Sequence, residues 1–78
     1  MGETKTNHYQ FSMALSAYQL EAYYVGSVKN VVVTCDNGQT LQLPINVFKP
    51  YVSRVGVHGR FIVYVDDNHK FIRIERCQ

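Results

Sequence analysis

The chain has 78 residues, 46% of them hydrophobic, including six tyrosines and four phenylalanines; this is enough for one packed domain and excludes two. No apolar run is long enough to span a membrane, and the polar first ten residues lack the apolar core of a secretion signal. We therefore expect a cytoplasmic protein without a membrane contact, with residues 1–7 as a disordered tail and residues 8–78 as a single domain.

The formal net charge of +2 is too small to indicate nucleic-acid binding by itself. The distribution is uneven, because residues 1–40 carry a net charge of −1 and residues 41–78 carry +3. The later basic residues favour an anionic partner only if the fold gathers them on one face.

The two cysteines, Cys35 and Cys77, lie far apart and do not form a CxxC pair. The three histidines show no spacing typical of a zinc site. We expect two free thiols, no metal and no cofactor.

Residues 8–15 alternate apolar and polar side chains, which predicts a half-buried strand. A short helix is predicted next, over residues 17–24, because Ser16 and Gln19 have the spacing of a capping box and Gly26 is placed to end it. Helical spacing predicts a covered face and a side nearer solvent. The covered face is Ala17, Leu20 and Tyr24, and the side nearer solvent is Tyr18, Glu21 and Tyr23.

Residues 28–35 and 39–43 predict two strands of a hairpin. A loop at residues 36–38 with Gly38 in the left-handed conformation pairs Val33 with Leu41, and it puts the apolar side chains on one face. Cys35 is then a core thiol. The segment between Pro44 and Pro50 predicts one helical turn with Ile45 and Phe48 on the same side, and residues 51–58 continue as strand or loop.

A second hairpin is predicted from residues 59–65 and 70–76, with a loop at residues 66–69 in which Asn68 is best suited to a left-handed conformation. Both of its strands have apolar residues in odd and even positions, so we expect it to lie at the centre of the sheet with both faces buried. Phe61, Val63, Val65, Ile72 and Ile74 form one face. The helix is expected to cover the other, with Ile62, Tyr64 and Phe71.

The predicted fold class is therefore α+β and mostly β. We expect a five-stranded antiparallel sheet curled into a small, partly open barrel, with one short helix between strands 1 and 2.

Several segments carry a family resemblance: Phe11-Ser12, Ser16-Ala17, Tyr23-Tyr24, Gly26, Leu43-Pro44, Lys49-Pro50, and above all residues 56–61 and 67–71. With these segments the chain resembles a family of short bacterial proteins known only as a domain of unknown function. The resemblance implies a bacterial, free-standing, single-domain protein, and it carries over no activity, ligand or catalytic residue.

The most suggestive local cluster is the His-Gly-Arg-Phe segment, residues 58–61, because an imidazole and a guanidinium beside a flexible glycine can hold a phosphate or carboxylate. A structural alternative is that Gly59 fits a bend, Phe61 packs in the core and Arg60 pairs with a carboxylate such as Glu75. The acidic loop at residues 66–68 lacks the glycine and distant glutamate of a calcium loop. Asp67 and His69 have no nucleophile near them in sequence, so catalysis is not expected.

Our leading hypothesis is a non-enzymatic binding module that contacts an anionic partner such as RNA or single-stranded DNA. Tyr51, Tyr64 and Phe71 would supply rings for stacking. The candidate binding residues are Lys49, Arg54, His58, Arg60 and Arg73. The alternative is a protein-interaction or homo-oligomeric module that uses Tyr18, Tyr23 and a sheet edge.

Overall fold

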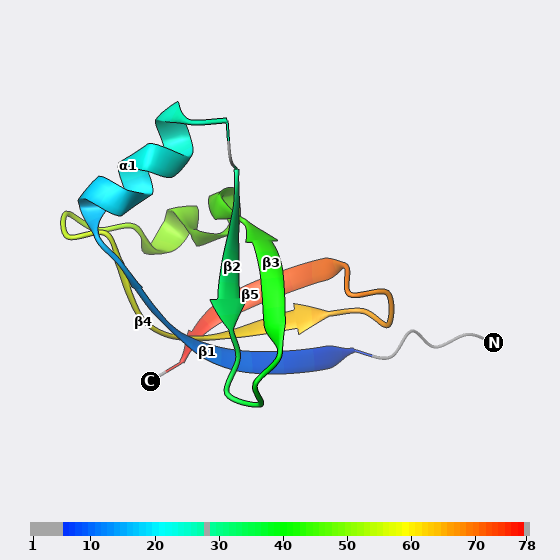
Figure 1. Ribbon diagram of the computed structural model, residues 1–78. Helices are drawn as coiled ribbons and strands as arrows, with labels where there is room; N and C mark the ends of the chain where they lie inside the picture. The colour runs from blue at the N-terminus through cyan, green and yellow to red at the C-terminus, as the bar shows by residue number, and fades with distance from the viewer. Residues whose placement is uncertain (1–5, 28, 78) are drawn as a thin grey trace.

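The computed structural model describes residues 6–27 and 29–77. Its elements follow the expected order of strand, helix, strand, strand, proline-bounded turn, strand and strand (Figure 1). They are β1 (Asn7–Leu15), α1 (Ala17–Val25), β2 (Asn30–Thr34), β3 (Thr40–Pro44), the 3-10 helix η1 (Ile45–Tyr51), β4 (Val57–Val65) and β5 (Phe71–Cys77). Of the tail expected over residues 1–7, residues 1–5 lie outside the described part of the chain, and Asn7 belongs to β1.

The strands form two antiparallel sheets, one of three strands in the order β1-β4-β5 and one of two strands, β2-β3. The α+β, mostly β class is confirmed, but the prediction of a single five-stranded sheet curled into a partly open barrel is wrong. The β2-β3 hairpin runs across β1 and touches it at one bridge, Phe11 with Cys35 (Figure 1). Each sheet has one apolar face, and stacking the two faces buries both, whereas edge-to-edge extension would leave both uncovered.

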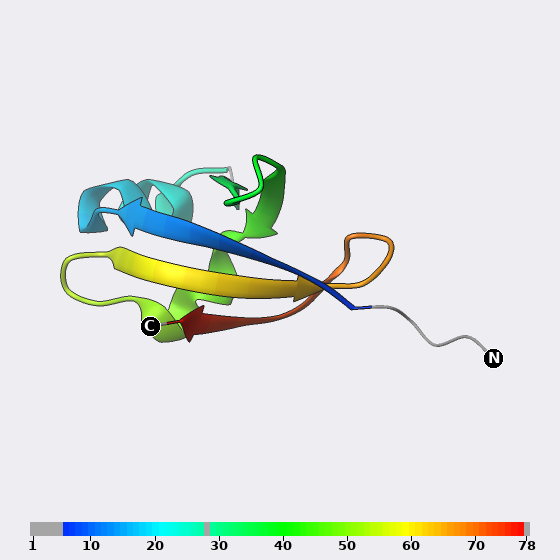
Figure 2. The same ribbon diagram turned by 90° about the horizontal axis from the view of Figure 1, so that it is seen from below.

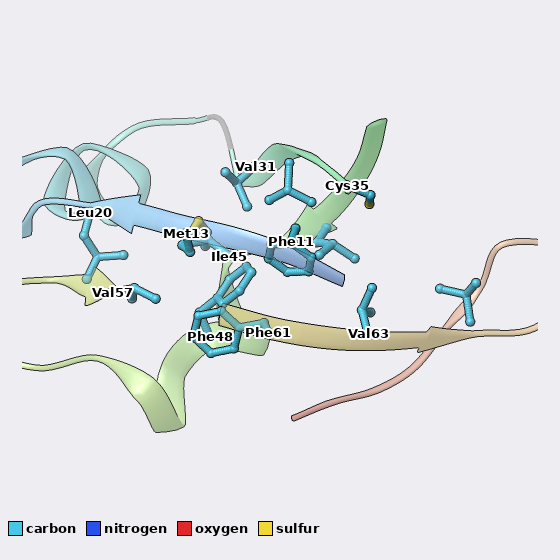
Figure 3. Close-up of a cluster of buried hydrophobic side chains, with 13 residues drawn as sticks. Phe11, Met13, Leu20, Val31, Cys35, Ile45, Phe48, Val57, Phe61 and Val63 are labelled. Atoms are coloured by element: carbon cyan, nitrogen blue, oxygen red, sulfur yellow. The ribbon is translucent and has the colours of Figure 1, made fainter. Parts of the chain in front are cut away.

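Three phenylalanine rings meet between the two sheets (Figure 3). Phe11 of β1, Phe48 of η1 and Phe61 of β4 are each 0% exposed. Their ring centroids lie 5.6–6.2 Å apart, with two contacts edge-on and one stacked. Such aromatic pairs contribute about 0.5–1.5 kcal/mol beyond the burial of their area. Ile45 is buried with Phe48, which confirms the predicted inner side of this segment. Its predicted length of one turn is wrong, because η1 has seven residues and continues through Pro50.

β4 is the central strand of its sheet and β5 is an edge strand (Figure 2). The prediction that both strands of this hairpin lie centrally is therefore wrong for β5, most of whose residues are exposed. The helix also covers a different face from the one expected, because Leu20 is buried in the same cluster as Phe11 and Phe61. Ile62 and Tyr64 lie on the opposite, uncovered face and are half-buried by their neighbours.

Both caps of α1 follow the sequence. Ser16 and Gln19 form the reciprocal capping box, and the helix ends before Gly26. The predicted inner face is right only for Leu20, because Ala17 and Tyr24 are exposed and Tyr23 is half-buried against the core. The helix therefore rests on the core along a line through Leu20 and Tyr23, three residues apart, and not along the line through Leu20 and Tyr24.

The register of the first hairpin is confirmed: Val33 pairs with Leu41, and Gly38 has a φ of 90°. In the second hairpin the left-handed residue is His69, with a φ of 64°, and not Asn68. The Asp66 carboxylate accepts hydrogen bonds from the backbone N–H groups of Asn68 and Lys70 at 2.8 and 2.9 Å. These two bonds hold the loop around Asp66, and the left-handed conformation falls on His69, between the two donors.

Within the described residues, no helix has both the length and the apolar character needed to cross a membrane.

We predict that Gly56→Ala destabilises the fold far more than Gly38→Ala. Both glycines have positive φ, so alanine costs about 1–2 kcal/mol in backbone strain at either position. At Gly56 the added Cβ would also lie 2.7 Å from the carbonyl carbon of Ser16, whereas at Gly38 it meets open space. We expect a loss above about 3 kcal/mol for Gly56→Ala. Urea unfolding followed by circular dichroism checks this, and equal losses for the two variants would contradict it.

Candidate functional site

The His-Gly-Arg-Phe segment forms the first half of β4, and its imidazole is engaged by its own chain. His58 Nε2 lies 2.8 Å from the carbonyl oxygen of Val55, in the turn that precedes β4. Because a carbonyl oxygen only accepts, Nε2 carries the proton and donates it. His58 thus holds this turn closed, and its Nε2 is not free for a ligand.

Gly59 lies beside Arg76, which packs over the end of the core. The Arg76 Nη2 atom donates to the carbonyl oxygen of His58 at 2.8 Å. Its guanidinium carbon lies 5.6 Å from the Tyr51 ring centroid and 5.5 Å from that of Phe61. A Cβ on Gly59 would lie 3.5 Å from Arg76 Nε, an ordinary contact distance, so space does not exclude a side chain here. The φ of 134° does disfavour one, because residues with a Cβ rarely adopt it.

Arg60 forms an ion pair with Asp36, and the two side chains share two hydrogen bonds. Arg60 also donates to Ser12 Oγ at 3.0 Å and to Gln10 Oε1 at 3.3 Å. The hydrogen bond from Arg60 lowers the pKa of Asp36, and the same bond raises the pKa of Arg60. The structural alternative for Arg60 is thus the one observed, although its carboxylate partner is Asp36 and not Glu75.

This ion pair fastens the two sheets to each other. Asp36 begins the β2-β3 turn, and its backbone N–H donates to the Gln10 carbonyl oxygen of β1 at 2.8 Å. The turn therefore passes around the edge of β1, and its carboxylate reaches Arg60 on the outer face of β4. The guanidinium is thus bound by side chains from two other segments of the fold, β1 and the β2-β3 turn.

Arg73 is engaged in a similar way on the outer face of β5. Its Nε donates to Glu75 at 3.0 Å, which raises the pKa of Arg73, and its guanidinium carbon lies 3.9 Å above the centroid of the Tyr64 ring. The guanidinium covers one face of that ring. Tyr51 is also committed, because its ring packs against Phe61 at 5.2 Å. Two of the three rings expected to stack on bases therefore already have partners.

The remaining candidates lie elsewhere. Lys49 is exposed on η1, which covers the inner face of the three-stranded sheet, and Arg54 is exposed in the turn before β4. Arg60 and Arg73 lie on the outer face. The five candidates thus do not share one surface, and the anionic-partner hypothesis gains no support from where they lie.

The two cysteines are free, and Cys35 is buried, as the register of its hairpin predicted. Burial raises the pKa of the Cys35 thiol, and the charge of Asp36 adds to the effect. In residues 6–27 and 29–77, no group of three His, Cys, Asp or Glu side chains is placed to hold a metal ion.

The outer side of α1 exposes large aromatic and apolar side chains to solvent. Tyr18 is 83% exposed and Val25 is 78% exposed. Beside them runs an open groove of about 500 Å³ between the helix and the end of β1. It is lined by Leu15, Tyr18, Gln19, Ala22, Tyr23, Gly26 and Ser27.

Tyr18 and Tyr23 were expected from the sequence as a contact pair, and the structure places both in this groove. Leu15, Ala22 and Val25 were missed. A sequence signal for them exists, because apart from the tyrosines the residues of α1 are all apolar except Gln19 and Glu21. A helix with so few polar residues normally has a larger buried side, whereas the core fully buries Leu20 alone from this helix.

We predict that Asp36→Asn lowers the stability of the fold at neutral pH and has little effect in acid. The pKa of Asp36 is lower in the folded state, so its contribution is present above the unfolded value of about 4 and is lost as the pH falls through the folded value. Urea midpoints measured across this range should converge for the variant and the original chain. The control is Asp67→Asn, an exposed turn residue for which we expect little change. A pH-independent difference for Asp36→Asn would contradict the role of the ion pair.

Comparison with known proteins gives one match. The model of the family "Protein of unknown function (DUF2835)" covers residues 7–77, from the start of β1 to the end of β5. No curated protein and no solved structure matches the chain. Because the family model spans nearly the whole sequence, the chain belongs to the DUF2835 family of proteins of unknown function.

Proposed function

We propose that this protein is a non-enzymatic binding module, and that the outer side of α1 with its groove binds an apolar segment of another protein. The observation that carries the proposal is the mismatch between the composition of α1 and its burial. Nearly all of its side chains are apolar or aromatic, yet among them the core fully buries Leu20 alone. A groove lined mainly by apolar and aromatic side chains is a suitable contact site for an apolar segment of another protein.

The helix is presented as a fixed element. The capping box holds its first turn, and Lys29 Nζ donates to the carbonyl oxygens of Tyr23 and Tyr24 at 3.4 and 3.2 Å near its last turn. A partner therefore meets a surface that is already ordered, which reduces the entropy lost on binding.

The exposed side chains suit such a contact. Tyrosine is enriched among residues that dominate binding energy, because it offers a large rigid area and few rotatable bonds. Full burial of a large apolar side chain contributes about 1.5–3 kcal/mol. Tyr18 and Val25, both largely exposed, have most of this energy still to gain.

An anionic partner such as RNA or single-stranded DNA stays the competing hypothesis, with Lys49 and Arg54 as its exposed cations. The cytoplasmic location also stays a prediction from the sequence. The experiment below separates the two kinds of partner.

We predict that a photo-reactive benzoylphenylalanine at Tyr18, in the full chain made in its native cell, yields one discrete cross-linked species of protein character. The control carries the same probe at Val32, which is exposed on the β2-β3 hairpin away from α1. Adding Ala22→Arg in the groove should abolish the Tyr18 cross-link, whereas Gln42→Arg on β3 should leave it intact.

Three results would contradict the proposal. One is a Tyr18 product removed by nuclease, which identifies a nucleic acid. Another is equal cross-linking from Tyr18 and Val32. The third is the absence of any product from Tyr18.

A further inference from the structure

β5 presents an open backbone edge. It ends the three-stranded sheet, and among the described residues no strand lies beyond it (Figure 2). The direction of its backbone groups follows from the ladder. The Gln10 carbonyl oxygen accepts a hydrogen bond from the Asp36 N–H, so the backbone N–H and C=O groups of Gln10 point away from β4. Because these groups alternate in direction along a strand, those of Phe11 point toward β4, where they meet the backbone of Phe61.

The same alternation continues across β4 to β5. Since the backbone N–H and C=O groups of Phe61 point toward β1, those of Ile62 point toward Glu75 of β5. The backbone groups of Ile74, the residue before Glu75, then point away from β4, to the open side of the sheet. The hydrogen bond from the Tyr51 hydroxyl to the Ile74 carbonyl oxygen, at 3.3 Å, agrees with this direction. The carbonyl oxygen keeps a second lone pair, and the Ile74 N–H faces the open side.

The exposed residues of this edge are two apolar ones at its start and the charged Arg73, Glu75 and Arg76 after them. Phe71 is 39% exposed and Ile72 is 43% exposed, and they follow each other at the start of the strand. Ile74 is half-buried. The charged residues and the register shift near Phe71 restrict which strands can pair with this seven-residue edge, so a partner strand has to match its charges.

The charges on β5 are self-complementary in a single register. A symmetric antiparallel pair of β5 strands can be centred on Arg73, on Ile74 or on Glu75 while most of the strand stays paired. Centring on Arg73 sets two arginines opposite each other, and centring on Glu75 sets two glutamates opposite each other. Centring on Ile74 places Arg73 opposite the partner's Glu75 on both sides of the axis, which is the favourable cross-strand arrangement.

We propose that β5 binds β5 of a second copy of this chain as an antiparallel ladder centred on Ile74, which joins two three-stranded sheets into one. Backbone hydrogen bonds between the two strands and the burial of Phe71 and Ile72 by the partner supply the affinity. The Arg73–Glu75 pairs are exposed, so at about 0.2–1 kcal/mol each they fix the register more than the strength. The dimer is therefore weak, and it does not depend on the proposed function of α1.

The test uses two charge-reversal variants of the full chain, Arg73→Glu and Glu75→Arg. Each variant alone sets like charges opposite each other and should sediment as a monomer at concentrations where the original chain dimerises. Their equimolar mixture restores opposite charges at both places and should dimerise as the original chain does. Within each variant the intrachain ion pair is broken, so a purely intrachain role for these residues cannot produce recovery in the mixture.

The control pair is Lys49→Glu and Glu21→Arg, which reverses charges outside β5 and should leave dimerisation unchanged, separately or mixed. Sedimentation equilibrium and native mass spectrometry give the masses. A monomeric original chain at the highest soluble concentration would overturn the proposal. So would dimers formed by either β5 variant alone, or a mixture that stays monomeric.

Discussion

The meeting of Phe11, Phe48 and Phe61 between the two sheets is the contact on which the rest of the structure depends. It joins β1, η1 and β4, which come from the first, middle and last thirds of the chain. Once these rings are buried, the alternation of each strand decides which side chains face inward. The outer face of the three-stranded sheet carries Ile62 and Tyr64 among mostly polar residues, and the β2-β3 hairpin and α1 both pack over the inner face.

The residues that looked most suited to chemistry serve this arrangement. His58 closes a turn, Gly59 has a positive φ that other residues rarely adopt, Arg60 binds Asp36 of the β2-β3 turn, and Phe61 is buried in the core. A histidine, a glycine and an arginine in a row are typical of anion sites because of their donors. Here each donor group discussed above is satisfied by the protein itself, and a binding role for this segment would have to break contacts that hold the fold together.

The sequence predicted correctly those features of the fold that depend on residues close together in the chain. The capping box, the buried side of the proline-bounded turn and the register set by Gly38 all follow from residues within a few positions of one another. What could not be predicted depends on contacts across the chain. Arg60 lies 24 positions from Asp36, and no periodicity reveals that a hairpin turn passes around β1 to reach it. The same holds for β5, whose apolar residues in odd and even positions suggested a buried strand, although its place in the order makes it an edge.

The account implies that the molecule has a firmly held centre and a helix attached mainly through Leu20 and Tyr23, with its other side chains left for a partner. Native-state amide hydrogen exchange measures this difference directly. We predict that the amides of Phe11 and Phe61 exchange only through global unfolding, and that the amides of α1 exchange through local opening at a clearly lower free energy. Equal protection in α1 and at the centre of β4 would contradict the account, because it would mean that the core already holds the helix as firmly as its own strands.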